Sequence, residues 1–291
     1  MYKNDNIRLY ILMIFAMLIW GVSWPSGKIV GQYTSPHIIM VWRFIFAALT
    51  IATIMMFLKI KLKLPKTTLI YVLISAVSLI GYNYNYLKGT QIGMASLGGV
   101  IVPTLSPLVT YLIVLRLFKK KIVKKDFFGI ITGISGGLIL LRIWDINFND
   151  LIISGNIYFI LAAISWSVVT VCTQKSSADL HVLNFSFWVY SLAFLFSFIF
   201  APWELLLNVF SFNWIFWINF FIISIGAIGF GTTIFFLVTM RLGSEKSTSF
   251  MYLVPTSAVS FSLLILGESL ALSTIVGGSL AISAVYLINR K

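Results

Sequence analysis

Long runs of apolar residues without a charged side chain recur along this chain, and they restrict the folds it can adopt. A helix that crosses a bilayer needs about 20 mostly apolar residues, and backbone polar groups in lipid must be hydrogen-bonded within the protein. Only 10% of the residues are charged, against roughly 25% in soluble domains. The sequence therefore predicts an all-α polytopic membrane protein. The uncharged runs are Leu9–Gly27, Thr67–Leu87, Gly89–Leu115, Leu151–Gln174, Leu205–Met240, Ser247–Gly267 and Ser269–Asn289.

Ten transmembrane helices fit these runs and the residues that flank them. Two runs exceed the length of one span, so they hold loop residues as well as a helix. The fifth helix is short, because only 15 uncharged residues separate Asp126 from Arg142. The expected spans are Arg8–Val30, Pro36–Leu58, Thr68–Lys88, Ala95–Leu117, Phe127–Leu141, Ile153–Thr173, Leu183–Ala201, Trp214–Met240, Ser247–Leu266 and Ser269–Ile288.

The positively charged residues gather in loops, which predicts how the chain is oriented. With the N-terminus inside, 17 of the 21 Lys and Arg residues fall on the cytoplasmic side and 3 on the outer side. Short cytoplasmic loops are enriched in Lys and Arg, so both termini are expected in the cytoplasm. Attraction to anionic lipid headgroups explains the net charge of +13. Nucleic-acid binding is not expected, because no soluble domain is left to perform it.

The chain also repeats itself. A Trp–X–Val triplet that begins at Trp20 recurs at Trp166, and a Pro–Thr pair at Pro103 recurs at Pro255. Residues 1–150 and 151–291 are each expected to form a five-helix repeat. Because five is odd, the second repeat enters the membrane from the opposite side, and the two repeats are inverted. Inverted repeats are typical of secondary transporters with a substrate site near the middle of the bilayer, where the halves meet.

Short motifs in both halves resemble the EamA family of the drug/metabolite transporter superfamily. The first half is similar to the family's opening W-G…K…P…R-F, and the second half to its ending P…L-G-E…G. The resemblance implies a ten-helix carrier of small organic metabolites, with export as the usual direction. The residues that carry it are Trp20–Gly21, Lys28, Pro36, Arg43–Phe44, Val254–Pro255, Leu266–Glu268 and Gly277–Gly278.

Two stripes of aromatic and hydroxyl side chains are candidates for substrate binding. Trp20, Ser23 and Trp24 share one face of the first helix, because they lie three and four residues apart. Trp166 and Thr170 form the matching stripe on the sixth helix. We expect both stripes to line a central cavity. The alternative is an aromatic belt at the membrane interface, which the mid-span positions of Trp20 and Trp166 disfavour.

The third helix contains an unusually polar run from Tyr82 to Tyr86. Phenol and amide groups are costly to expose to lipid, so they should face protein or water. Tyr82, Asn85 and Tyr86 are therefore further candidates for substrate binding. Hydrogen bonding between helices is the alternative use of these side chains, and it also turns them inward.

Pro103 and Pro255 lie inside expected helices at equivalent positions of the two halves. A proline within a helix frees a backbone carbonyl and kinks the helix. Both residues are therefore candidates for gating, and simple curvature of the helix is the alternative.

Arg43 is the only charged residue well inside an expected span. Charges within the membrane are commonly functional, and this one could attract a substrate carboxylate or phosphate. The structural alternative, which we favour, is pairing with backbone carbonyls or with Glu268.

The sequence offers no set of side chains for catalysis or for holding a metal or a cofactor. Cys172 is the single cysteine, which excludes an intramolecular disulfide and a cysteine zinc site. No acidic residue lies in the middle of an expected span. We therefore expect no enzyme activity, no metal and no cofactor.

These features predict a secondary transporter in the cytoplasmic (inner) membrane that works by alternating access around a central, largely aromatic cavity. Its expected partners are the lipid bilayer and a small neutral or zwitterionic substrate such as an amino acid, and the protein is a monomer or a homodimer. The first alternative is a carrier of a phosphorylated or nucleotide-linked metabolite that uses Arg43 and Lys28. The others are a membrane-embedded enzyme and a non-transporting membrane protein.

Overall fold

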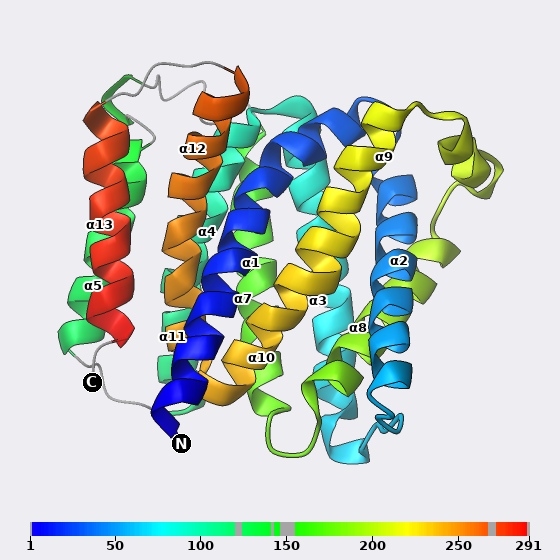
Figure 1. The fold of residues 1–291 in the computed structure, drawn as a ribbon, viewed down its shortest axis with the longest axis horizontal. Helices are drawn as coiled ribbons and strands as arrows, with labels where there is room; N and C mark the ends of the chain where they lie inside the picture. Colours follow the sequence, from blue (N-terminus) through cyan, green and yellow to red (C-terminus); the bar gives the residue numbers. More distant parts are fainter. Residues whose placement is uncertain (1, 120–123, 141–142, 146–154, 267–271, 290–291) are drawn as a thin grey trace.

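The chain folds into a bundle of long helices packed side by side (Figure 1). The computed structural model describes residues 2–119, 124–140, 143–145, 155–266 and 272–289. The expected boundary between residues 150 and 151 lies outside these ranges, as does Glu268. Many apolar side chains on the outer faces are exposed, such as Phe57 at 82%, as a surface in contact with lipid requires. The expected all-α polytopic class is confirmed.

The first half contributes five helices, and each overlaps an expected span. α2 begins at a proline, which suits the first turn of a helix because the missing N–H would have no partner there. α4 continues through Pro103 and Pro107 without a break. The helices are α1 (Tyr2–Gly31), α2 (Pro36–Phe57), α3 (Lys66–Ile92), α4 (Ala95–Leu117) and α5 (Lys124–Leu140), followed by the short 3₁₀ helix η1 (Ile143–Asp145).

In the second half, two of the five expected spans are composite. α7 (Asn156–Lys175), α8 (Val182–Ile199) and α13 (Leu272–Asn289) are regular helices. Seven helical runs in the described ranges are long and apolar enough to cross a membrane. The eighth span consists of α9 (Trp214–Phe221), η3 (Ile222–Thr232) and α10 (Thr233–Leu242), and the ninth of α11 (Ser244–Ser249), η4 (Phe250–Tyr252) and α12 (Leu253–Leu266).

The helices of the two halves pack in matching pairs. α3 packs on α7 and α1 packs on η3, so the third span of each half contacts the first span of the other. α2 packs on α8 and α5 packs on α13, which pairs these spans with their own repeat equivalents. The halves therefore interlock, and α1 begins at the end of the bundle where α13 ends (Figure 1).

Small residues permit the close approach of α5 and α13. A methyl group added at Gly136 would lie only 2.9 Å from the carbonyl oxygen of Gly277. Glycines at such a helix seam let the two backbones approach closely.

The expected eighth helix is not regular, because its middle segment, η3, is a π-helix of 11 residues. Three side chains from other helices donate hydrogen bonds to its carbonyls. Arg43 bonds to Ile223, Trp20 to Ala227 and Tyr190 to Ile228. π-helical turns are rare and are found mainly at functional sites. Here the wider turns are held by partners from α1, α2 and α8.

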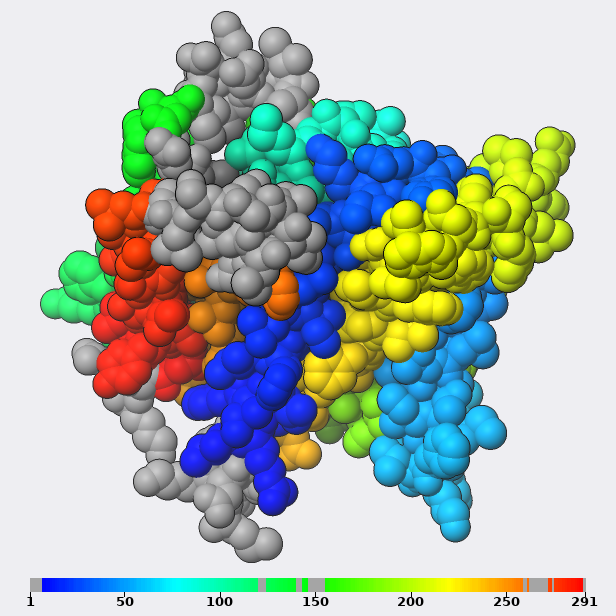
Figure 2. Space-filling model, turned by 45° about the horizontal axis from the view of Figure 1, so that its top comes forward, coloured from blue at the N-terminus to red at the C-terminus, as the bar shows by residue number. Residues whose placement is uncertain are grey.

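A nine-residue 3₁₀ helix, η2 (Trp203–Ser211), projects beside α9 in yellow-green (Figure 2). Trp203, Leu207 and Phe210 are largely exposed, whereas Leu206 is buried and accepts a hydrogen bond from Trp42. Exposed Trp with apolar neighbours is typical of a segment at the membrane–water interface.

Candidate functional site

The two halves enclose a small chamber near the middle of the bundle. It holds about 10 Å³ of free space, room for about one water molecule. Side chains from α1, α2 and α3 meet η3 there. The chamber is lined by Trp20, Ser23, Arg43, Leu79, Tyr82, Asn83, Tyr86, Ala227, Ile228 and Thr232.

The two repeat-related tryptophans pack on each other beside this chamber, which Trp20 lines and Trp166 does not. The rings of Trp20 and Trp166 stand edge to face, with centroids 4.9 Å apart. Trp20 Nε1 donates a 3.1 Å hydrogen bond to the carbonyl of Ala227, which fixes the ring against η3. The ring of Tyr82 lies 4.9 Å from that of Trp166. The aromatic wall thus joins α1, α3 and α7.

Tyr86 is part of the chamber lining. Its hydroxyl donates to the carbonyl of Ser23, and its ring is parallel to that of Tyr82. Trp24 stands edge-on to Tyr86 with centroids 4.9 Å apart. A methyl group added at Gly27 would overlap the Tyr86 hydroxyl, so the glycine is what allows the tyrosine to pack here.

Arg43 lies in the chamber wall and is only 2% exposed. Its Nη2 and Nε donate to the carbonyl of Ile223 over 2.8 and 3.2 Å. Its guanidinium carbon lies 5.2 Å from the centre of the Tyr86 ring, within the range of a cation–π contact. The carbonyl pairing that we favoured from the sequence is therefore present, while Glu268 lies outside the described ranges. Nη1 has no hydrogen-bond partner among the described residues.

Asn83 is a site residue that the sequence did not single out within the polar run of α3. It is fully buried, its Nδ2 donates to the carbonyl of Leu79 over 2.8 Å, and its Oδ1 has no partner in the described ranges. The η3 residues of the lining were also missed. Gly226, Gly229 and Gly231 mark η3 in the sequence, but their spacing alone did not indicate a π-helix.

Four other sequence candidates contact the chamber less directly or not at all. Asn85 donates to Gly81 in its own helix, and Thr170 does the same to Trp166. Neither side chain is part of the lining. Pro103 lies within the uninterrupted α4, whereas Pro255 follows the 3₁₀ turn η4. The expected roles of these residues stay predictions.

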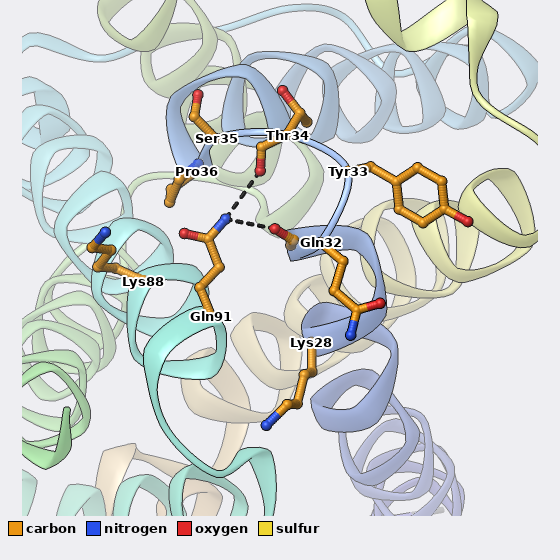
Figure 3. Close-up of a pocket in the computed structure, with 9 residues that line it drawn as sticks. Lys28, Gln32, Tyr33, Thr34, Ser35, Pro36, Lys88 and Gln91 are labelled. Carbon is orange, nitrogen blue, oxygen red and sulfur yellow. Dashed lines mark hydrogen bonds between the residues drawn. The ribbon is translucent and has the colours of Figure 1, made fainter. Parts of the chain in front are cut away.

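A wider vestibule of about 480 Å³ is lined by residues at the C-terminal ends of α1 and α3 and in the turn that leads to α2 (Figure 3). Lys28 Nζ donates to the carbonyl of Gly93 over 3.0 Å. Gln91 Nε2 bridges the carbonyls of Gly31 and Thr34. Lys88 also lines the vestibule, and neither the vestibule nor the chamber has an acidic residue in its described lining.

The described part of the chain has no group of three His, Cys, Asp or Glu side chains placed to hold a metal ion. Arg43 and the two lysines make the described lining cationic. The chemistry available at the site is ring stacking, hydrogen bonding and attraction of negative charge.

The chain is similar in sequence to two bacterial transporters and similar in fold to a solved structure. YvbV of Bacillus subtilis (strain 168), described as an uncharacterized transporter, is 27% identical and aligns with 100% of this chain and 94% of its own length. YyaM of the same organism, also described as an uncharacterized transporter, is 24% identical over 60% of this chain and 58% of its own. A solved crystal structure covers 97% of this chain and 96% of its own with a TM-score of 0.75 at 16% identity, which concerns the fold alone.

The sequence pattern of the EamA-like transporter family matches residues 7–142 and again residues 153–290. These two matches cover nearly the whole chain, one in each half. The chain therefore belongs to the EamA-like transporter family and is a multi-pass membrane transporter, not an enzyme.

Proposed function

We propose that the protein moves a small organic metabolite, an amino acid or a similar molecule, across the cytoplasmic membrane by alternating access around the central chamber. The observation that supports this most is the chamber itself, which lies between the two repeats and takes residues from both. Export is the direction that the family resemblance implies, and the loop charges favour cytoplasmic termini.

The size of the chamber implies a change of conformation. About 10 Å³ is too small for any metabolite, so the halves must separate before a substrate enters. In this proposal the seal toward the vestibule includes the Tyr86–Ser23 hydrogen bond and the ring of Trp24, which stands edge-on to Tyr86. In the proposed cycle this seal breaks when the chamber opens to the vestibule, and contacts on the opposite side break in the other half of the cycle.

Flux in proteoliposomes tests this proposal. The purified protein is reconstituted, and uptake of radiolabelled amino acids is compared with that of Trp20→Ala, Tyr82→Ala and Trp166→Ala. Each variant removes a ring of the aromatic wall and should lower flux by about tenfold or more, as expected for a loss of roughly 1.4 kcal/mol or more of binding energy. Trp144→Ala, on the exposed η1, is the control and should retain flux. If all three variants transport an identified substrate normally, the chamber is not the substrate site.

A second candidate is a carrier of phosphorylated or nucleotide-linked metabolites. Lys28 and Lys88 in the vestibule and Arg43 in the chamber favour it, because all three attract anions. Uptake of a radiolabelled sugar phosphate, lost in Lys28→Gln and Lys88→Gln, would support this alternative. Uptake of amino acids that is indifferent to both substitutions would exclude it.

A further inference from the structure

Two buried polar atoms of the chamber lining lack a hydrogen-bond partner among the described residues, and they have opposite character. Arg43 Nη1 is a cationic donor, and Asn83 Oδ1 is a neutral acceptor. The Arg43 side chain is 2% exposed and that of Asn83 is 0% exposed, so bulk water does not satisfy either atom. Unpartnered polar atoms are unfavourable in a buried site, so a ligand with matching groups would be stabilised there.

Four other polar groups of the lining are already engaged. Trp20 Nε1 donates to Ala227, the Tyr86 hydroxyl to Ser23, and Thr232 Oγ1 to Ala227. The Ser23 hydroxyl donates to the carbonyl of Trp20. Once the chamber has opened, Arg43 Nη1 and Asn83 Oδ1 are therefore available to a substrate without competition from these groups.

The orientation of both groups is fixed by their remaining hydrogen bonds. Arg43 uses Nη2 and Nε on the carbonyl of Ile223, which leaves Nη1 as the free arm of the guanidinium. Asn83 uses Nδ2 on the carbonyl of Leu79. A carbonyl accepts only from the amide nitrogen, so the atom that Asn83 leaves free is the oxygen.

We infer that the chamber recognises a zwitterion: Arg43 Nη1 binds the carboxylate of the substrate, and Asn83 Oδ1 accepts a hydrogen bond from its ammonium group. This inference rests on the proposed function and names its substrate class, an α-amino acid. The aromatic wall of Trp20 and Tyr82 adds a preference for an apolar side chain. A carboxylate is a strong acceptor for a guanidinium, and an ammonium has donors but no acceptor, so the two ends of the substrate are told apart.

Arg43 also connects the proposed substrate site to η3, because it is bonded to the carbonyl of Ile223. The guanidinium that holds the carboxylate through Nη1 holds Ile223 in η3 through its other nitrogens. A carboxylate bound to Nη1 therefore lies on the same guanidinium that holds this segment, and the bonds from Arg43 to Ile223 stay in place. Arg43 is in this way a substrate-binding residue that also positions η3.

The first measurement uses the wild-type protein, so it does not depend on the folding of any variant. Proteoliposomes are screened with radiolabelled amino acids, and the best apolar substrate is challenged with unlabelled analogues. For phenylalanine these are phenylalaninamide, which lacks the carboxylate, and 3-phenylpropionate, which lacks the ammonium. Each analogue should compete at least ~10-fold more weakly than phenylalanine, because a site built for a polar group rejects a ligand without it.

The second measurement assigns the two groups to residues. Arg43→Gln should abolish the discrimination between phenylalanine and phenylalaninamide, and Arg43→Lys should restore part of it. Asn83→Leu should abolish the discrimination against 3-phenylpropionate. Arg241→Gln, at the exposed end of α10, is the matched control and should behave as wild type. Gel filtration and thermal melting in detergent establish that each variant is folded.

The outcomes separate this inference from the proposed function. If wild type transports a metabolite but accepts analogues without carboxylate or ammonium equally well, the inference is overturned and the transport function stands. The inference also fails if folded Arg43→Gln and Asn83→Leu discriminate like wild type. If wild type transports no member of a panel of amino acids, monocarboxylates, amines and sugars, both the zwitterion inference and the proposed transport function are overturned.

Discussion

At the scale of single residues, the side chains that make the chamber are those that a membrane helix rarely carries in its middle. Trp20, Tyr82, Tyr86 and Arg43 stand out in the sequence for this reason, and all four line the chamber. Whether a polar side chain turns into a cavity or back onto its own helix was less predictable. Asn83 faces the chamber while Asn85, two residues on, does not.

Thr170 shows why the direction of a polar side chain is hard to predict from the sequence. A hydroxyl or amide in a helix can satisfy itself on the carbonyl four residues earlier, at little cost in space. Thr170 does so on Trp166 over 2.9 Å. The polarity of such a residue can be read from the sequence, but its choice of partner cannot.

The hydroxyl of Tyr86 gives the first prediction at this scale. Tyr86→Phe removes the hydrogen bond to Ser23 and should weaken the seal between chamber and vestibule by about 0.5–1.5 kcal/mol. In a Cys172→Ser background, a Ser23→Cys reporter should then react several-fold faster with a membrane-impermeant maleimide.

Tyr84→Phe is the matched control, because Tyr84 lies on the same helix with its ring against His37. It should leave the reaction rate of the reporter unchanged. Equal rates in Tyr86→Phe and in the parent would show that the hydroxyl does not hold the seal.

At the scale of elements, every expected span coincides with a helix or a broken helix in the described ranges. Length and apolarity alone fix these spans. The π-helical η3 could not be predicted in the same way. A segment that is apolar on all sides has no polar face whose spacing would reveal a change from α-helical to π-helical turns. The hydrogen-bond donors that hold η3 also come from other helices, namely from Trp20, Arg43 and Tyr190.

Two glycines of η3 offer a matched pair of substitutions. A methyl group at Gly231 would lie 2.7 Å from Trp20 Nε1, whereas one at Gly226 would meet Ile19 at an ordinary 3.4 Å. Gly231→Ala should therefore displace Trp20 from Ala227 and lower stability by about 1–3 kcal/mol. Thermal melting in detergent measures the difference.

Gly226→Ala should melt within about a degree or two of wild type, since changes away from strained contacts have small effects. Similar melting of both variants, with flux retained, would mean that the Trp20–Ala227 bond contributes little to holding η3.

At the scale of the whole molecule, the loop charges predict the orientation in the membrane, and this prediction is open to a direct test. Cys172 is the single cysteine, so Cys172→Ser gives a background without thiols. Asn208→Cys, on exposed η2, should react with an impermeant maleimide added to intact cells.

Ser177→Cys, in the exposed turn between α7 and α8, should react only after the cells are permeabilised. The opposite pattern would place the termini outside and turn the vestibule toward the cytoplasm.

The chamber takes its lining unequally from the two repeats: α1, α2 and α3 supply seven of the ten residues, and η3 supplies the other three. In the proposed site, the first repeat therefore supplies most of the contacts to the substrate, and the second repeat supplies the π-helical part of the wall. If so, exchange of residues 20–86 between relatives is expected to change the choice of substrate, while residues 222–232 are kept. The proposed site thus predicts that substrate choice can be engineered separately from the conformational change.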